Sequence, residues 1–114
     1  VVKNKLAELG AKADNVVIHN ARLSNQNENY TNTLFKRVQR RGELRRDVQR
    51  QVNNNRNVFG AMMVANGEAS AMVTGLTRSF VDCFSDVRMA ITASAGAARV
   101  FGVSLVVTKG HALF

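Results

Sequence analysis

The sequence predicts an α/β fold, in which amphipathic helices alternate with short apolar strands. In several stretches between residues 30 and 91, apolar side chains recur every three or four positions, which is the spacing of one helix face. Continuous apolar or β-branched runs at 16–18, 71–73 and 100–107 have instead the length and composition of strands. A chain of 114 residues, 46% of them hydrophobic, suffices for one domain with one core.

Five helices are expected from this spacing. The first covers residues 2–9 and ends before Gly10, and the second covers residues 30–41 and ends at Gly42. The other three are centred on apolar residues at positions 44, 48 and 52, at 58, 59, 62 and 63, and at 80, 84, 87 and 91. The asparagines at 53–55 end the third helix and are suited to cap the next one.

The expected strands leave the chain incomplete as a domain. The run 100–107 is followed by a turn at Lys109 and Gly110, and residues 111–114 begin a further strand. The sequence also opens on Val1 rather than on methionine. We therefore expect residues 1–114 to form a partial domain, a middle slice of a longer chain.

The formal net charge of +8 is concentrated in one block. Residues 36–56 contain eight Lys or Arg residues and two acidic ones, Glu43 and Asp47. Such a block is either a solvated surface, a site for a phosphorylated ligand, or a nucleic-acid surface. Aromatic residues do not alternate with these arginines, so nucleic acid is the least favoured of the three.

Several classes of chemistry have no support in the sequence. His19 and His111 are the two histidines, and neither has a Cys, Asp or Glu at metal-ligand spacing. The single cysteine, Cys83, lies on an apolar helix face, as a structural thiol does, and one cysteine fits a reducing, cytoplasmic location. No apolar run approaches the roughly 20 residues that a membrane span needs. We therefore expect no metal, no membrane and no catalytic residue.

The strand expected at 71–73 provides a candidate ligand site. It ends at Thr74 and Gly75, and ligands of open α/β sheets bind at the carboxyl ends of strands, where glycine lets the backbone approach them closely. Two tight turns are the alternative interpretation of the glycines at 67 and 75. Arg78 and Arg88 follow, and each is suited either to bind a phosphate or to pair with a carboxylate.

The stretch RNVFGAMMVANGEASAMVTG, residues 56–75, resembles the phosphate acetyl/butyryltransferase family. The segments 19–24, 39–42, 46–50, 76–80, 85–88 and 99–104 are most similar to one branch, the acetyltransferase-like C-terminal domain of bacterial NADP-dependent malic enzymes. The resemblance covers nearly the whole chain. It implies a two-lobed α/β fold, of the phosphotransacetylase and isocitrate dehydrogenase kind, with a ligand cleft between the lobes.

The resemblance also implies a function. In the malic-enzyme branch the domain senses acetyl-CoA and assembles a homo-oligomer, while NADP and a divalent metal belong to the catalytic part of the longer protein. The alternative is an active phosphate acetyltransferase, which moves acetyl groups between coenzyme A and phosphate. Departures from the family pattern at Asn66, Ser70 and Met89 argue against acyl transfer more than against coenzyme A binding.

Residue by residue, Thr74 and Gly75 match the Ser-Gly pair that ends the family's strand, and Arg88 matches an arginine near the ligand cleft. Arginine suits the phosphates of coenzyme A because its planar fork donates two hydrogen bonds at once. The expected acetyl-CoA-binding residues are Thr74, Gly75, Arg78, Arg88, Arg37, Arg40 and Arg41.

Overall fold

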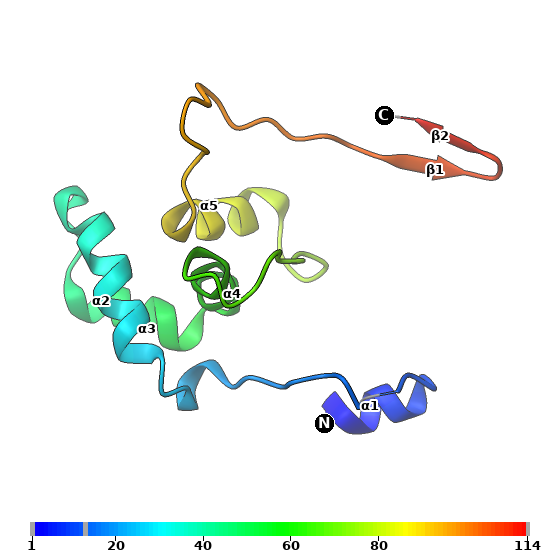
Figure 1. Ribbon diagram of the computed structural model, residues 1–114, viewed down its shortest axis with the longest axis horizontal. Helices are drawn as coiled ribbons and strands as arrows, with labels where there is room; N and C mark the ends of the chain where they lie inside the picture. Colours follow the sequence, from blue (N-terminus) through cyan, green and yellow to red (C-terminus); the bar gives the residue numbers. More distant parts are fainter. Residues whose placement is uncertain (1, 13, 114) are drawn as a thin grey trace.

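The computed structural model describes residues 2–12 and 14–113, and most of its regular structure is helical. The helices are α1 (Val2–Glu8), α2 (Asn27–Val38), α3 (Arg45–Asn54), α4 (Arg56–Ala65) and α5 (Phe80–Ala90), with short 3-10 turns η1 (Ala21–Leu23) and η2 (Gln39–Arg41). Two strands, β1 (Val106–Thr108) and β2 (His111–Leu113), form an antiparallel hairpin. Helices α2 to α5 pack together, whereas α1 and the hairpin lie apart at the ends of long connecting segments (Figure 1).

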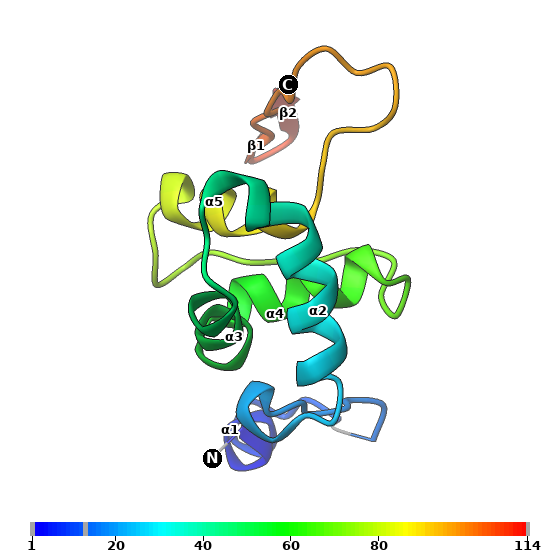
Figure 2. The same ribbon diagram turned by 90° about the vertical axis from the view of Figure 1, so that its left-hand side faces the viewer.

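The core lies where α2, α3, α4 and α5 meet (Figure 2). Helices α2 and α3 place their apolar faces there at the spacing of four that the sequence predicted. The Tyr30 ring of α2 meets the Phe59 ring of α4 edge-on, with centroids 5.3 Å apart. The fully or almost fully buried apolar side chains are Tyr30, Leu34, Val38, Val48, Val52, Val58, Phe59, Ala61, Met62, Cys83 and Ala90.

The ends of the helices follow local rules, which is why the sequence located them well. Gly42 ends the α2–η2 segment with a φ of 85°, in the left-handed region that favours glycine. The side chain of Asn55 accepts a hydrogen bond from the Asn57 N–H and so caps α4, as predicted for the asparagine run. Ser79 caps α5 in the same way, accepting from the Asp82 N–H at 3.1 Å.

The helix predicted at 2–9 is confirmed as α1, and Gly10 follows it with a φ of 67°. The apolar stripe of α1 is more exposed than the apolar faces of α2 and α3. Leu6 is half-buried, while Val2 and Leu9 are 53% and 73% exposed.

For the part of the chain that the structure describes, the strand predictions at 16–18 and 71–73 are wrong, and the one at 100–107 is realised only at its end, where β1 begins at Val106. Residues 16–18, 71–73 and 100–105 follow open paths without strand pairing, and Val73 is 99% exposed. A strand needs a neighbouring strand to hydrogen-bond to its backbone, and an apolar run cannot provide that partner by itself. The hairpin forms because the turn at Lys109 and Gly110 brings 106–108 back onto 111–113. Residue 114, included in the predicted last strand, lies outside the described residues.

The predicted α/β class is therefore only partly realised. The described residues contain one helical cluster and one two-stranded sheet, and the two lobes expected from the resemblance are not seen within 2–12 and 14–113. The physical reason is again the lack of strand partners, because a parallel sheet needs strands that come together from distant parts of a chain.

Candidate functional site

The segment that joins α4 to α5 is held against the core at its start. The Tyr30 hydroxyl of α2 donates to Glu68 Oε2 at 2.7 Å, just beyond the end of α4. Burial, together with this bond and the charge of Glu68, raises the pKa of Tyr30 well above its usual value, so the hydroxyl stays protonated as the donor. This contact orients the chain as it leaves α4 for residues 72–78.

Residues from 72–78 and one face of α5 line an open cavity of about 540 Å3, here called the Thr74 cavity. Thr74, Gly75 and Arg78, three of the predicted ligand residues, lie together in its wall. Its opposite wall is apolar and includes Phe80 and Phe84, whose rings stack with centroids 5.6 Å apart. The cavity therefore combines an apolar surface with a few polar groups, as small-molecule sites do.

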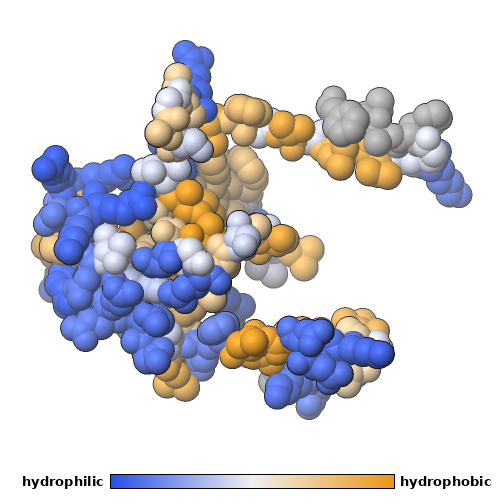
Figure 3. Space-filling model, viewed as in Figure 1, coloured by the Kyte–Doolittle hydropathy of each residue, from blue (hydrophilic) through white to orange (hydrophobic). Residues whose placement is uncertain are grey.

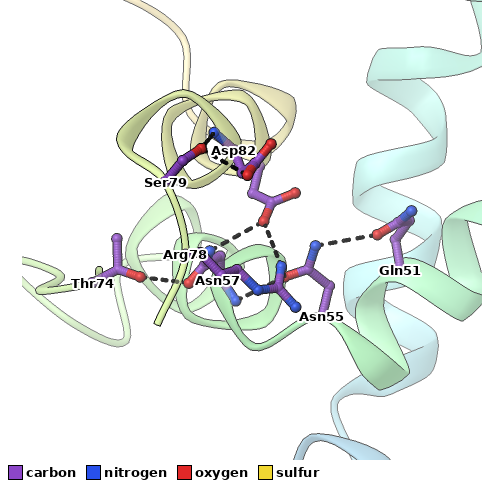
Figure 4. A network of polar contacts seen from close by, with 8 residues as sticks. Gln51, Asn55, Asn57, Thr74, Arg78, Ser79 and Asp82 are labelled. Atoms are coloured by element: carbon purple, nitrogen blue, oxygen red, sulfur yellow. Dashed lines mark hydrogen bonds and ion pairs between the residues drawn. The ribbon is translucent and has the colours of Figure 1, made fainter. Parts of the chain in front are cut away.

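A polar network centred on Asn57 fixes one side of this cavity (Figure 4). Asn57 is 8% exposed; its side-chain oxygen accepts from the Thr74 hydroxyl, and its Nδ2 donates to Asp86 Oδ2 at 3.1 Å. Arg78 Nη1 donates to the same Asp86 oxygen at 3.2 Å, and reaches Asn55 Oδ1 at 3.5 Å. The carboxylate interpretation of Arg78 is thus the one that the structure bears out.

Sequence reasoning missed Asn57. Asn57 lies in the first turn of α4, and its side chain joins this helix to Thr74 and to α5. Buried amides are normally hydrogen-bonded on both ends, and here the two partners come from residues 17 and 29 positions away. No local pattern could have indicated those partners.

We expect the substitution Asn57→Ala to lower the free energy of unfolding by about 1–3 kcal/mol, because it removes two hydrogen bonds of a buried amide and leaves the half-buried Asp86 without this donor. Urea unfolding followed by circular dichroism measures this change. Asn25→Ala, at an exposed asparagine, is the matched control and should have little effect. An Asn57 variant as stable as that control would contradict the structural role.

A second cavity of about 400 Å3, here called the arginine cavity, adjoins the first across α5. Phe84 and Val87 line both cavities. Three cations, Arg41, Arg88 and Arg99, line the second one, and the Arg88 guanidinium lies 5.8 Å from the centre of the Phe84 ring. Arg99 follows α5 by nine residues, and sequence reasoning did not select it as a site residue.

Two other predicted residues lie outside the lining of both cavities. Arg37 donates to the backbone carbonyl of Ala90, at the carboxyl end of α5, where the helix dipole favours a cation. Arg40 is exposed in the η2 turn. The structure therefore assembles Thr74, Gly75, Arg78, Arg41 and Arg88 around α5, and assigns Arg37 to the contact between helices.

The described residues were also compared with the expectations for metal ligands, for the cysteine and for membrane spans. Within 2–12 and 14–113, no three His, Cys, Asp or Glu side chains gather as metal ligands. Cys83 is a buried free thiol, as predicted, and it borders the Thr74 cavity. Among the same residues, no helix has the length and apolar character needed to span a membrane.

Comparison with known proteins identifies the family. The sequence model of the phosphate acetyl/butaryl transferase family matches residues 1–114. The chain belongs to this family. This match confirms the resemblance that residues 56–75 indicated.

The chain is also similar to curated proteins that are named NADP-dependent malic enzymes. It is 49% identical over 96 residues to the NADP-dependent malic enzyme of Rhizobium meliloti (strain 1021), and 40% identical over 96 residues to the probable NADP-dependent malic enzyme of Rickettsia prowazekii (strain Madrid E). Each match covers 84% of this chain and 12% of the relative. The chain therefore matches about an eighth of the length of these relatives.

Proposed function

We propose that this chain is a regulatory, acetyl-CoA-sensing domain of a cytoplasmic NADP-dependent malic enzyme. The similarity to proteins of that name supports the identity of the longer protein, and the free thiol of Cys83 fits a reducing compartment. The oxidation and decarboxylation of malate to pyruvate, with NADP and a divalent metal, then belongs to other parts of the longer protein. Residues 1–114 contribute part of its phosphotransacetylase-like domain.

The observation that carries the acetyl-CoA proposal is the pair of adjoining cavities on α5. Their volumes, about 540 and 400 Å3, fall in the range of small-molecule sites. Coenzyme A joins a phosphate-rich nucleotide to a long, weakly polar arm that ends in the thioester. We assign the phosphates to Arg41, Arg88 and Arg99, and the thioester arm to the apolar Thr74 cavity.

The composition of the two cavities favours binding over catalysis. Acyl transfer needs a general base close to the reacting groups. In the described part of the chain, no His, Asp or Glu lines either cavity. The second candidate function is an active phosphate acetyltransferase with its remaining residues elsewhere in the longer protein, and the family assignment favours it.

We also propose that the domain takes part in a homo-oligomer. Large apolar side chains are exposed on residues 100–108, here called the hairpin arm, among them Phe101, Val103, Leu105 and Val107. Exposed apolar surface gathers along the hairpin arm in Figure 3. Extended contiguous surfaces of this kind mark interfaces.

The acetyl-CoA proposal is tested on the full-length protein by calorimetric titration with acetyl-CoA. Malate oxidation and acetyl phosphate formation are then assayed side by side. We expect saturable binding that changes the rate of malate oxidation without acetyl phosphate formation. Rapid acetyl phosphate formation would establish the transferase alternative, and the absence of binding would overturn both. Sedimentation velocity on the same sample should show an oligomer, and a monomer would contradict the assembly role.

A further inference from the structure

A cavity of about 610 Å3 lies between residues 18–22 and the junction of α3 with α4. It shares no lining residue with the Thr74 cavity or the arginine cavity, so the acetyl-CoA proposal does not use it. Ile18, Ala21, and Phe59 and Gly60 of α4 provide apolar surface, and the rest of the wall is polar or basic. The cavity is large enough for a small metabolite.

Arg22 is fixed in this wall by the η1 turn. Its Nε donates to Asn54 Oδ1 at 3.0 Å, and its backbone N–H donates to Asn20 Oδ1 at 3.1 Å. Because the first bond uses the Nε–H, the two terminal nitrogens of the guanidinium are left for a ligand. Among the residues that the structure describes, no acceptor is bonded to them.

The charge of the cavity is positive. Arg56, the first residue of α4, supplies a second guanidinium. Within 2–12 and 14–113, the lining contains neither Asp nor Glu, and neither arginine is in an ion pair. Two guanidinium groups without a competing carboxylate favour an oxyanion, which accepts their hydrogen bonds in pairs.

Asn53 indicates a second property of the ligand. Its side-chain oxygen is buried and has no hydrogen-bond partner within the described part of the chain, and Asn53 lines the same cavity. Buried acceptors are normally satisfied. Rotation of the Asn53 side chain toward the cavity would let this oxygen accept from a hydroxyl or amine donor of a ligand.

We propose that this cavity is a second ligand site, separate from the acetyl-CoA cavities, for a small metabolite that carries an oxyanion and a hydrogen-bond donor. Arg22 and Arg56 bind the oxyanion, Asn53 accepts from the donor, and the carbon skeleton lies against Phe59. The site goes beyond the proposed function and does not depend on it. Its oxyanion is a phosphate ester or a carboxylate, since both accept hydrogen bonds from arginine.

The test is a calorimetric titration of the full-length protein at constant ionic strength, with inorganic phosphate in one arm and malonate in the other. The arm that shows saturable binding identifies the oxyanion. We expect Arg22→Gln and Arg56→Gln each to weaken that binding about tenfold, as the loss of a charge-assisted hydrogen bond does. Arg46→Gln is the matched control, because the Arg46 side chain is 80% exposed on α3 outside the cavity; it should leave binding unchanged.

Three results would overturn the proposal: no saturable binding of either anion, equal weakening by Arg46→Gln and Arg56→Gln, or loss of binding through Arg88→Gln alone. Arg56 is exposed, so its variant still decides the question if Arg22→Gln fails to fold. Asn53→Asp places a negative charge beside the anion and should weaken binding as well. Acetyl-CoA affinity, measured on the same variants, should remain unchanged, which separates failure of this site from failure of the proposed function.

Discussion

Replacing Leu34 by alanine is expected to lower the free energy of unfolding by about 2–5 kcal/mol. Leu34 is completely buried in the core formed by α2, α3, α4 and α5. Truncating its side chain removes apolar contacts and leaves a space that the surrounding helices fill only in part. Urea unfolding of the full chain, followed by circular dichroism, measures the loss.

The matched control is Leu9→Ala, the same chemical change at a leucine that is 73% exposed beyond α1. It should alter the free energy of unfolding by less than about 0.5 kcal/mol. Equal losses for the two variants would mean that the buried face of α2 does not determine the stability of the helical cluster. The comparison therefore tests the packing and not merely the presence of helices.

The second large effect concerns the ligand. We expect Arg88→Ala to weaken acetyl-CoA binding about tenfold or more, because a charge-assisted hydrogen bond to a phosphate is lost from the arginine cavity. The guanidinium also lies over the ring of Phe84, which lines both cavities, so the variant removes a cation–π contact as well. Calorimetric titration of the full-length protein gives the dissociation constant.

Arg40→Ala provides the control for that experiment. Arg40 belongs to the same basic block and is exposed, but it lines neither cavity. Its removal lowers the net charge by the same amount, so unequal effects distinguish a local contact from general attraction of the polyanion. If the two variants bind acetyl-CoA equally well, the arginines form a solvated surface and the proposed ligand geometry is wrong.

The elements that the sequence predicted correctly are those with local causes. The repeats Tyr30–Leu34–Val38 and Leu44–Val48–Val52 indicated two helices, and the left-handed Gly42 separates them. Leu44 itself precedes α3 and is 52% exposed, so the boundary moved by one residue. Strands at 16–18 and 71–73 were predicted from composition, and the structure leaves them unpaired because pairing depends on residues far away in the chain.

In the candidate site, too, the local sequence indicated individual residues, whereas the contacts between distant residues became visible only in the structure. A glycine after an apolar run indicated Thr74 and Gly75, and the spacing of basic residues indicated the arginines. The sequence could not show that Asp86 binds Arg78 and Asn57 together, or that Arg37 contacts the end of α5. These contacts join residues 8 to 53 positions apart, and their geometry follows from how the helices pack.

By itself, the sequence determined the family, the positions of the helices and their caps, and the basic character of residues 36–56. Each depends on residue type and near-neighbour spacing, which act before any tertiary contact forms. Only the tertiary structure decided which arginines face a cavity and that Asn57 holds Thr74 in place. The physical reason is that cavities and buried hydrogen bonds arise between elements, whose relative placement depends on packing across the whole core.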